Sequence, residues 1–393
     1  MRSLWVDPDD QHFPPLSGNH DVDVAILGGG FSGIGAAYAF RDSGLSAVLL
    51  EARTVASGAS GRNAGFVLAG PASGYAASVE QLGNLEAEEV WRFTLDNNRT
   101  IARIVEDQGI DCGYLRRGSM SLAGSEEERQ RLHRDARALT ASAFPVCVVE
   151  RSDLPPPLDR HYHGGLLYFG NAEMNPGRFI RAVAGSARRS VDIHEGTLVE
   201  KISKSGTWLL EGAWGSVRAR SVIVATNAYT GVLLRGLPIS PARGQVMATE
   251  PLTRMVSPYP MYANNGYQYW RQTAEGRLVV GGWRDLDMAG ETGVDERLHR
   301  GIQCALDGFA EMLLGAPPNV EYRWAGIMGF TPDRYPLVGA LEDGLWIAAG
   351  YSGHGVSMAF SCGMRVAEKV LGRSVSIPSS FGPARFAGAY SRA

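Results

Sequence analysis

Near the N-terminus the chain changes from an alternating to a continuously apolar pattern. Val22 and Val24 alternate with acidic residues, and the run continues to Leu27 without a polar side chain, which is typical of a buried parallel strand. Small residues over 33–42 predict a helix, and the apolar run "SAVLL" predicts a second strand that ends at Glu51. Together these elements predict a βαβ unit of roughly 30 residues.

The turn between the first strand and the helix has the spacing GxGxxG, at Gly28, Gly30 and Gly33. Glycines allow a tight turn and close approach of a pyrophosphate, while the helix N-terminus offers free N–H groups and partial positive charge. Glu51 follows about 20 residues later, where an acid accepts hydrogen bonds from ribose hydroxyls. The sequence therefore predicts dinucleotide binding, and the free carboxylate disfavours a ribose 2′-phosphate.

The remaining pattern predicts two interleaved domains. Helical patterns cover 86–108 and 126–139, an apolar strand at 222–225 returns to the parallel sheet, and 240–323 shows antiparallel strands and an amphipathic helix. The C-terminal part predicts a strand, a glycine loop over 350–355 and a helix. We expect an α/β fold: a discontinuous Rossmann-type nucleotide-binding domain (1–85, 166–235 and 324–393) and an inserted antiparallel-sheet-plus-helix substrate domain (86–165 and 236–323). The site is expected where the domains meet.

Composition excludes several classes of protein. The 393 residues are 45% apolar and 20% charged, with a net charge of −3 and no basic block, so we expect a globular protein without a nucleic-acid partner. No run of about 18 apolar residues predicts a membrane span, and the acidic start lacks a signal-peptide layout, so we expect a cytoplasmic protein. The four cysteines form no CxxC pair, and His161 and His163 lack further ligands, so no metal site is expected.

The segment "SGASGRNAG", from Ser57 to Gly65, contains almost nothing with which to build a core. Its small residues would let a flat cofactor approach the backbone closely. Ser60, Arg62 and Asn63 are candidate hydrogen-bond donors to phosphates or ring atoms. The alternative is a mobile surface loop with one solvated arginine.

Seven stretches of sequence together resemble the D-amino-acid oxidase superfamily of FAD-dependent amine oxidoreductases, which includes glycine, sarcosine and gamma-glutamylputrescine oxidases. They are "FPPLSG…DVAILGGGFSG", "SGASGRNAG", "VIVATNAYT", "RGQVMATEPL", "GRLVVGGWRD", "RWAGIMGFTPDRYPLVG" and "GYSGHGV", and they span nearly the whole chain. The leader and the Gly-Arg-Asn tripeptide are most similar to the gamma-glutamylputrescine oxidase branch.

This resemblance implies FAD and a set of residues that bind it. Ser57–Gly65 would pass along the pyrophosphate and isoalloxazine ring, and the backbone of Val199 would lie beside the adenine. The helix after the 350–355 loop would stabilise the reduced flavin by its dipole, whereas the alternative is an ordinary βα turn with a satisfied His354. The candidate cofactor-binding residues are Gly28, Gly30, Phe31, Ser32, Gly33, Glu51, Ala52, Arg53, Gly58, Ser60, Arg62, Asn63, Ala64, Gly65, Val199, Thr226, Asn227, Gly326, Gly353, His354, Gly355 and Val356.

The chain departs from its relatives at four positions. Gly326 replaces the cysteine that binds flavin covalently in sarcosine-oxidase relatives, so we expect non-covalent FAD. Val279 and Ser357 replace two lysines, the first of which promotes reaction with oxygen in those relatives, and the only lysines here are at 201, 204 and 369. Met328 replaces the arginine that holds the substrate carboxylate in glycine-oxidase-like enzymes.

The Met328 departure leaves two hypotheses about the substrate: an amine without an α-carboxylate, or a carboxylate held by Arg271 or Arg284. Tyr267 and Tyr269 share a face of one predicted strand and Trp270 lies on the other, and such aromatic side chains are either core or cation–π contacts to an amine. The candidate catalytic residues are His354, Tyr267 and Tyr269, and the candidate pocket residues are Met328, Arg271 and Trp270.

The resemblance thus implies flavin-dependent oxidation of an amine C–N bond. Hydride would pass from the α-carbon to FAD, the imine would be hydrolysed, and O2 or another acceptor would take the electrons. The alternatives are an amino-acid or N-alkyl-glycine oxidase or dehydrogenase and a non-catalytic FAD-holding assembly protein. No acid–base pair can be identified.

Overall fold

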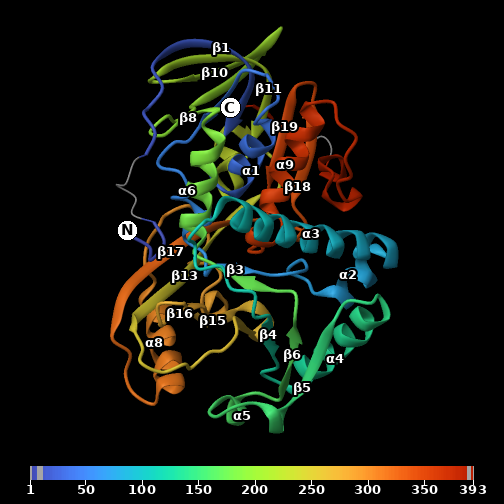
Figure 1. Cartoon of the computed structure of the whole chain (residues 1–393), viewed down its shortest axis with the longest axis vertical. Coiled ribbons are helices and arrows are strands. Elements are labelled where there is room, and N and C mark those ends of the chain that lie inside the picture. The colour runs from blue at the N-terminus through green and yellow to red at the C-terminus, as the bar shows by residue number, and fades with distance from the viewer. Residues whose placement is uncertain (1, 7–11, 387–390, 393) are drawn as a thin grey trace.

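Two large sheets organise the chain, one in each half of the molecule (Figure 1). The computed structural model describes residues 2–6, 12–386 and 391–392, so parts of both expected terminal segments lie outside it. Each sheet has eight strands. The upper sheet combines segments from both ends of the chain with the central segment 192–224, and the lower sheet uses the segments on either side of that central one.

The upper sheet contains the predicted βαβ unit. Its strands run in the order β18 (Leu337–Glu342), β19 (Leu345–Ala349), β11 (Gly215–Val224), β1 (Gly18–Leu27), β2 (Ala47–Leu50) and β8 (Asp192–His194), with β10 (Thr207–Gly212) and β9 (Lys201–Ser205) extending it from β11. β1 pairs in parallel with both β11 and β2, and Leu27 aligns with Val224 and Leu50. The return of the apolar strand at 222–225 to the parallel sheet is confirmed.

Small residues bring helices close to one another above this sheet. α1 (Phe31–Phe40) packs between α6 (Pro176–Ala187) and α9 (Ala359–Val370). A Cβ at Gly35 would lie 2.2 Å from the Phe360 carbonyl oxygen, and one at Gly363 would lie 1.8 Å from that of Ser32. Glycine at both positions is therefore what allows α1 and α9 to pack at backbone contact.

The lower sheet is mainly antiparallel and carries one long helix. Its order is β17 (Val320–Phe330), β13 (Ser240–Pro251), β16 (Arg277–Gly282), β15 (Gln268–Gln272), β14 (Met261–Ala263), β4 (Ser119–Leu122), β6 (Gly164–Tyr168) and β5 (Val146–Glu150). α8 (Arg300–Leu314) buries Ile302, Leu306 and Leu313 beneath β13 and β16. The amphipathic helix expected from the sequence is thus present.

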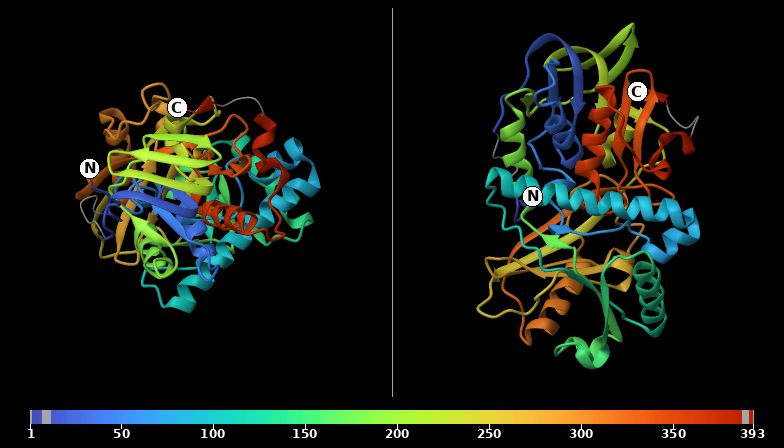
Figure 2. Two further views of the ribbon diagram at one scale, coloured as in Figure 1. Left: turned by 90° about the horizontal axis from the view of Figure 1, so that it is seen from above. Right: turned by 45° about the vertical axis from the view of Figure 1, so that its right-hand side comes forward.

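The other elements join the two halves. α3 (Asn84–Gln108) crosses the molecule between the sheets and ends at Gly109, whose φ is 61° (Figure 2). The remaining elements are α2 (Tyr75–Leu82), α4 (Glu126–Ala141), α5 (Leu158–His161), α7 (Thr230–Leu233), and the paired strands β3 (Phe66–Val67) with β7 (Ala172–Glu173) and β12 (Leu234–Arg235) with β20 (Ser391–Arg392).

Strand pairing corrects two of the expected domain boundaries. The boundaries at 166 and 324 would cut β6 and β17, yet both strands hydrogen-bond within the lower sheet. β17 follows β13 over most of its length, which ties residues up to Phe330 to the lower sheet. The apolar runs at these positions do not reveal which sheet each strand joins. The strands of both sheets have the same hydrophobic period and a similar residue composition.

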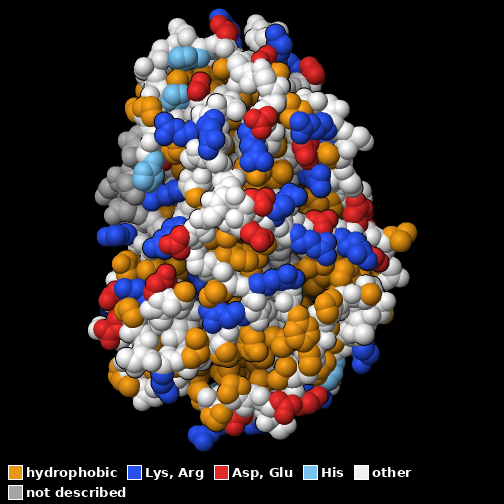
Figure 3. Space-filling view, in the orientation of Figure 1, with side chains coloured by type: hydrophobic (Ala, Val, Ile, Leu, Met, Phe, Trp, Pro, Cys, Tyr) orange, Lys and Arg blue, Asp and Glu red, His pale blue; other side chains and the backbone are white. Residues whose placement is uncertain are grey.

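The surface differs between the two halves. In the view of Figure 3, charged side chains are frequent over the upper half, and apolar side chains gather over the lower half. Within the described ranges, no helix has both the length and the apolar character needed to cross a membrane. The same residues contain no group of three or more potential metal ligands.

Candidate active site

One cavity of about 820 Å³ lies between the two sheets. It extends from the β1–α1 turn, past the loop over 57–65, to β13, β16 and β17 of the lower sheet. Its size is within the range of small-molecule and cofactor sites. The cavity therefore lies where the sequence predicts it, at the meeting of the two domains.

Close backbone contacts shape the β1–α1 turn at one end of this cavity. Gly28 has a φ of 104°, and a Cβ there would lie 2.8 Å from the Ala225 carbonyl oxygen. A Cβ at Gly33 would lie 1.8 Å from the Gly28 carbonyl oxygen. Ser60 Oγ accepts a 2.9 Å hydrogen bond from the N–H of Phe31, the first residue of α1. The helix N-terminus is thus exposed to the cavity with a polar side chain beside it.

Glu51 terminates β2 with its carboxylate held by the backbone. Its oxygens accept hydrogen bonds from the N–H groups of Gly29 (2.7 Å) and Arg53 (2.8 Å). Burial nevertheless raises the pKa of this carboxyl, and the charge of Glu195 raises it further. Each oxygen retains acceptor capacity toward the cavity, as binding of ribose hydroxyls requires.

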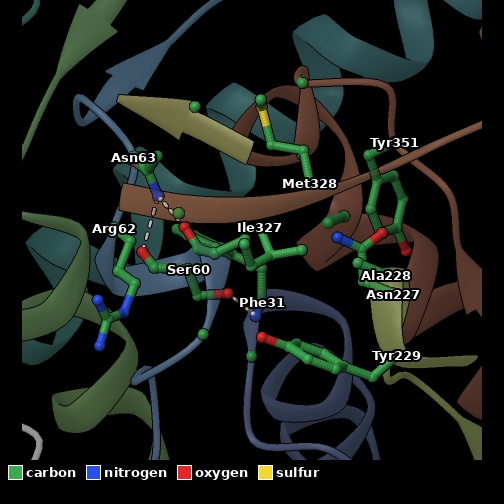
Figure 4. Close-up of a pocket in the computed structure, with 18 of the residues that line it drawn as sticks. Phe31, Ser60, Arg62, Asn63, Asn227, Ala228, Tyr229, Ile327, Met328 and Tyr351 are labelled. Atoms are coloured by element: carbon green, nitrogen blue, oxygen red, sulfur yellow. Dashed lines mark hydrogen bonds between the residues drawn. The ribbon is translucent and has the colours of Figure 1, made fainter. Parts of the chain in front are cut away.

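The 57–65 loop owes its shape to its polar side chains (Figure 4). Asn63 Nδ2 donates to the carbonyls of Ala59 (3.0 Å) and Ser60 (2.7 Å), and Asn63 Oδ1 accepts from Gly65 N (2.7 Å). Arg62 is buried, with its Nε on the Ser57 carbonyl and an ion pair to Glu296. Both side chains thus hold the loop while also lining the cavity, and their contact with a phosphate or ring atom stays a prediction.

The glycine loop before α9 is tied to the dinucleotide-binding half. Asn227 Oδ1 accepts a 3.0 Å hydrogen bond from Gly350 N, and Tyr351 Oη lies 2.6 Å from Ser32 Oγ on α1. His354 lines the cavity from this loop, and its Nδ1 is buried without a hydrogen-bond partner among the described residues. Burial lowers the pKa of His354 to about 4; the backbone of Ser352 opposes this shift, and the charge of Arg334 adds to it. The imidazole is therefore neutral at physiological pH.

Aromatic side chains form the wall at the lower sheet. Tyr262 lies 5.1 Å from Phe66, 5.8 Å from Tyr269 and 6.2 Å from His354, measured between ring centroids. Burial raises the pKa of both tyrosines, so their hydroxyls stay protonated. The Tyr269 ring fits over Gly281, where a Cβ would lie 2.3 Å from a ring carbon. We name Phe66, Tyr262, Tyr269 and His354 the aromatic chamber.

Most predicted site residues line the cavity, and the exceptions have clear causes. Those that line it are Gly28, Gly30, Phe31, Ser32, Glu51, Ala52, Arg53, Gly58, Ser60, Arg62, Asn63, Ala64, Val199, Thr226, Asn227, Tyr267, Tyr269, Gly326, Met328, Gly353, His354, Gly355 and Val356. Gly33 and Gly65 lie behind the wall and act by close packing: a Cβ at Gly65 would lie 2.2 Å from the Met174 carbonyl oxygen.

Two predicted pocket residues lie elsewhere. Trp270 is fully buried on the other face of β15, 4.7 Å from the Phe309 ring of α8. Arg271 is also buried and donates to the carbonyls of Ala64 (2.6 Å) and Met174 (2.8 Å), with an ion pair to Glu173. Both predictions are wrong, because alternation turns Trp270 away and local acceptors saturate Arg271.

Several cavity residues were not predicted. Tyr262, Phe330, Arg334 and Tyr351 line the wall, and the last three lie within stretches already singled out as motifs. Phe66, from β3, has no motif of its own. Its position depends on pairing of β3 with β7, which is not apparent from the sequence.

Comparison with known proteins identifies the family. Residues 23–369 match the model of the DAO family, described as FAD dependent oxidoreductase. The chain belongs to this family.

Individual members resemble the chain over nearly its full length. A probable oxidoreductase, OrdL, of Haemophilus influenzae is 26% identical, over 97% of this chain and 93% of that protein. The gamma-glutamylputrescine oxidoreductase of Escherichia coli is 28% identical, over 92% of this chain and 86% of that protein. The crystal structure of glycine oxidase from Geobacillus kaustophilus superposes with a TM-score of 0.80 at 23% identity, over 93% and 99% of the two chains. The Rossmann-type α/β fold is confirmed.

This DAO-family chain is an FAD-dependent oxidoreductase, and its cavity fits the cofactor on independent grounds. The close backbone contacts of Gly28 and Gly33 in the β1–α1 turn leave a space that larger side chains would fill. The N-terminus of α1 faces this space. The buried Nδ1 of His354 lacks a partner at the other end of the cavity. A ligand with a polar pyrophosphate centre and a ring bearing heteroatoms would satisfy both ends.

Glu296 joins the two domains beside this cavity. Its carboxylate pairs with Arg53 (2.7 Å) and with the buried Arg62 (3.0 Å). Replacing Glu296 with glutamine leaves the buried guanidinium without its counter-charge, which we expect to destabilise the fold by about 1–3 kcal/mol and to speed FAD release. Thermal unfolding with and without added FAD, and the rate of flavin release, measure this effect.

A matched control is Glu321→Gln, which breaks the more exposed pair with Arg277. We expect it to change stability by less than about 1 kcal/mol. Equal effects of the two substitutions would contradict a specific role of Glu296.

Proposed function

We propose that this protein oxidises a C–N bond of a small amine, with non-covalently bound FAD as the primary electron acceptor. The observation that carries the proposal is one continuous cavity from the dinucleotide-binding turn to the aromatic chamber. Such a cavity suits a cofactor and a small substrate lying end to end. The name of the gamma-glutamylputrescine oxidoreductase, to which this chain is similar, supports an amine as substrate.

FAD, when bound, supplies the hydride acceptor, and the chain supplies binding, orientation and exclusion of water. The aromatic chamber would receive the amine, because π faces attract a cation and apolar walls favour the neutral amine that reacts. The hydroxyls of Tyr262 and Tyr269 are available to orient the amine nitrogen. The neutral imidazole of His354 would complete a hydrogen bond at its Nδ1.

Gly326 supports non-covalent attachment of the cofactor. A Cβ at Gly326 would lie 3.0 Å from the Cβ of Arg62, so a larger side chain would be crowded there. Among the described residues that line the cavity, none is a cysteine. Denaturation should therefore release FAD into solution, where it can be measured after filtration.

The proposal includes a location and an electron acceptor. All four cysteines are free thiols, Cys147 and Cys304 being exposed, which supports the reducing cytoplasm. The net charge of −3 gives no support to a nucleic-acid partner. Electrons would pass to O2 or to another electron carrier.

Anaerobic bleaching of the oxidised-flavin absorption band tests the proposed function. The holoenzyme is mixed with polyamines, gamma-glutamylated amines, N-methyl amines, and D- and L-amino acids, and air is then readmitted. Bleaching by one of these classes is the expected result, and the rate of recovery in air separates an oxidase from a dehydrogenase. Failure of every C–N compound to reduce the flavin would overturn the proposal.

His354 is expected to influence the rate of flavin reduction without titrating near neutrality. Because burial lowers its pKa to about 4, the imidazole is neutral throughout pH 5.5–9, and the limiting rate should show no His354 inflection there. His354→Leu removes the polar atom at Nδ1 and should slow reduction by roughly tenfold, equivalent to one lost hydrogen bond. Anaerobic stopped-flow reduction at saturating amine measures both. An inflection near pH 6.5 that the substitution abolishes would instead identify a general base.

A further inference from the structure

Arg284 lies on the cavity wall next to the aromatic chamber. Its guanidinium carbon is 4.7 Å from the ring centroid of Phe330 and 5.5 Å from that of Tyr267. Tyr267, Tyr269, Met328 and Phe330 line the same cavity. The aromatic rings fix the plane of the guanidinium and leave its N–H edges available.

Arg284 differs from the buried arginines around the cavity. Arg62 pairs with Glu296, and Arg271 pairs with Glu173 in addition to backbone carbonyls. No ion pair or hydrogen bond of Arg284 occurs within the described part of the chain. Its positive charge thus faces the cavity without a protein counter-charge.

A strained turn directs Arg284 into this position. Trp283, the residue after β16, has a φ of 56°, which is unusual for a bulky side chain. Its N–H donates to the Tyr267 carbonyl (2.5 Å), and its indole packs 5.0 Å from the Phe309 ring. Contacts on both sides of the turn therefore hold the conformation that brings Arg284 to the wall.

We infer that Arg284 binds a carboxylate of the amine substrate, so that the substrates of this enzyme are amines that also carry an acid group. This inference rests on the proposed function. A planar guanidinium with free N–H edges matches a carboxylate in two parallel hydrogen bonds. Its charge would repel a purely cationic amine, and a carboxylate on the same molecule removes that repulsion.

The other charged groups that line the cavity are less suited than Arg284 to bind a substrate carboxylate. Three acids line the wall: Glu51 lies at the dinucleotide-binding turn, Glu296 is paired with Arg53 and Arg62, and Asp295 precedes Glu296 and makes no ion pair with Arg284 in the described part of the chain. Met328 lines the cavity with an apolar side chain, which offers no charge to a carboxylate. Arg334 also lines the cavity but is exposed, which makes it the natural control.

Binding of simple carboxylates to the oxidised holoenzyme tests the inference without turnover. Benzoate and butyrate are each compared with their carboxamides by titration of the visible flavin spectrum. We expect the wild-type enzyme to bind each acid at least tenfold more tightly than its amide. Arg284→Met retains the length and the apolar contact with Phe330 and should lose this preference, whereas Arg334→Met should change it less than threefold.

Two outcomes would overturn the inference: acids and amides that bind the wild-type enzyme equally, or an acid preference that survives in Arg284→Met. FAD content and melting temperature of each variant show that the comparison concerns folded holoenzyme. The proposed function fails separately, when no C–N compound bleaches the flavin. Bleaching by amines together with no acid preference would leave the function standing and remove only Arg284 as the anchor.

Discussion

Replacing Gly33 with alanine is expected to weaken FAD binding severely. The added Cβ would lie 1.8 Å from the Gly28 carbonyl oxygen, so the turn and α1 cannot keep their present contact. Overpacking against backbone costs about 3 kcal/mol or more, because no flexible side chain can move away. An energetic cost of that size in the β1–α1 turn corresponds to a loss of affinity for FAD of roughly a hundredfold or more. Flavin content after purification and the affinity of the apoprotein for added FAD measure the loss.

Gly185→Ala provides the matched control. Gly185 lies within α6, and no atom lies within 4 Å of a Cβ built there. Alanine should stabilise this helix by up to about 1 kcal/mol and leave FAD binding unchanged. If Gly33→Ala retained full flavin content and the melting temperature of Gly185→Ala, the close contact between α1 and the β1–α1 turn would be disproved.

The dinucleotide-binding unit could be predicted because its determinants are local. The apolar run to Leu27, the glycine spacing and Glu51 lie within one short segment, and each has a direct structural consequence. The observed helix starts at Phe31, two residues earlier than expected, since Gly30 serves as the N-cap. The parallel return of β11 follows from the same continuous apolar pattern.

The substrate side depends on contacts between distant segments, which the sequence does not specify. Alternation along β15 correctly places Tyr269 and Trp270 on opposite faces, but only the fold shows that the Trp270 face meets α8. The sequence alone does not distinguish Arg271 from Arg284 as the residue that faces the cavity. The carbonyls of Ala64 and Met174 saturate the first, while the turn at Trp283 leaves the second facing the cavity.

Roles within the 57–65 loop show a further limit of sequence reasoning. Small residues at this position indicate close approach of a cofactor, and the loop does line the cavity. The polar side chains among them, however, fold the loop itself: Asn63 makes three hydrogen bonds to nearby backbone. A donor in a binding motif can therefore also fold the motif itself.

Glu51→Gln is expected to weaken FAD binding by about 10- to 100-fold. The carboxylate now accepts hydrogen bonds from Gly29 N and Arg53 N, and an amide replaces one of its oxygens with a donor. Hydrogen bonds to a charged group contribute about 1.5–3 kcal/mol each, which corresponds to that change in affinity. Fluorescence titration of the apoprotein with FAD measures it.

The same substitution should remove a pH dependence of FAD binding. Burial raises the pKa of Glu51, so part of the apoprotein takes up a proton as the pH falls toward that value. In the apoprotein this group therefore favours the folded state at low pH, and its contribution is lost as the pH rises through the raised pKa. Ribose hydroxyls donate to the ionised form, so binding releases the proton and the wild-type affinity should weaken as the pH falls toward the raised pKa of Glu51. In Glu51→Gln the corresponding affinity should be flat; parallel curves for the two proteins would show that Glu51 does not contact the cofactor.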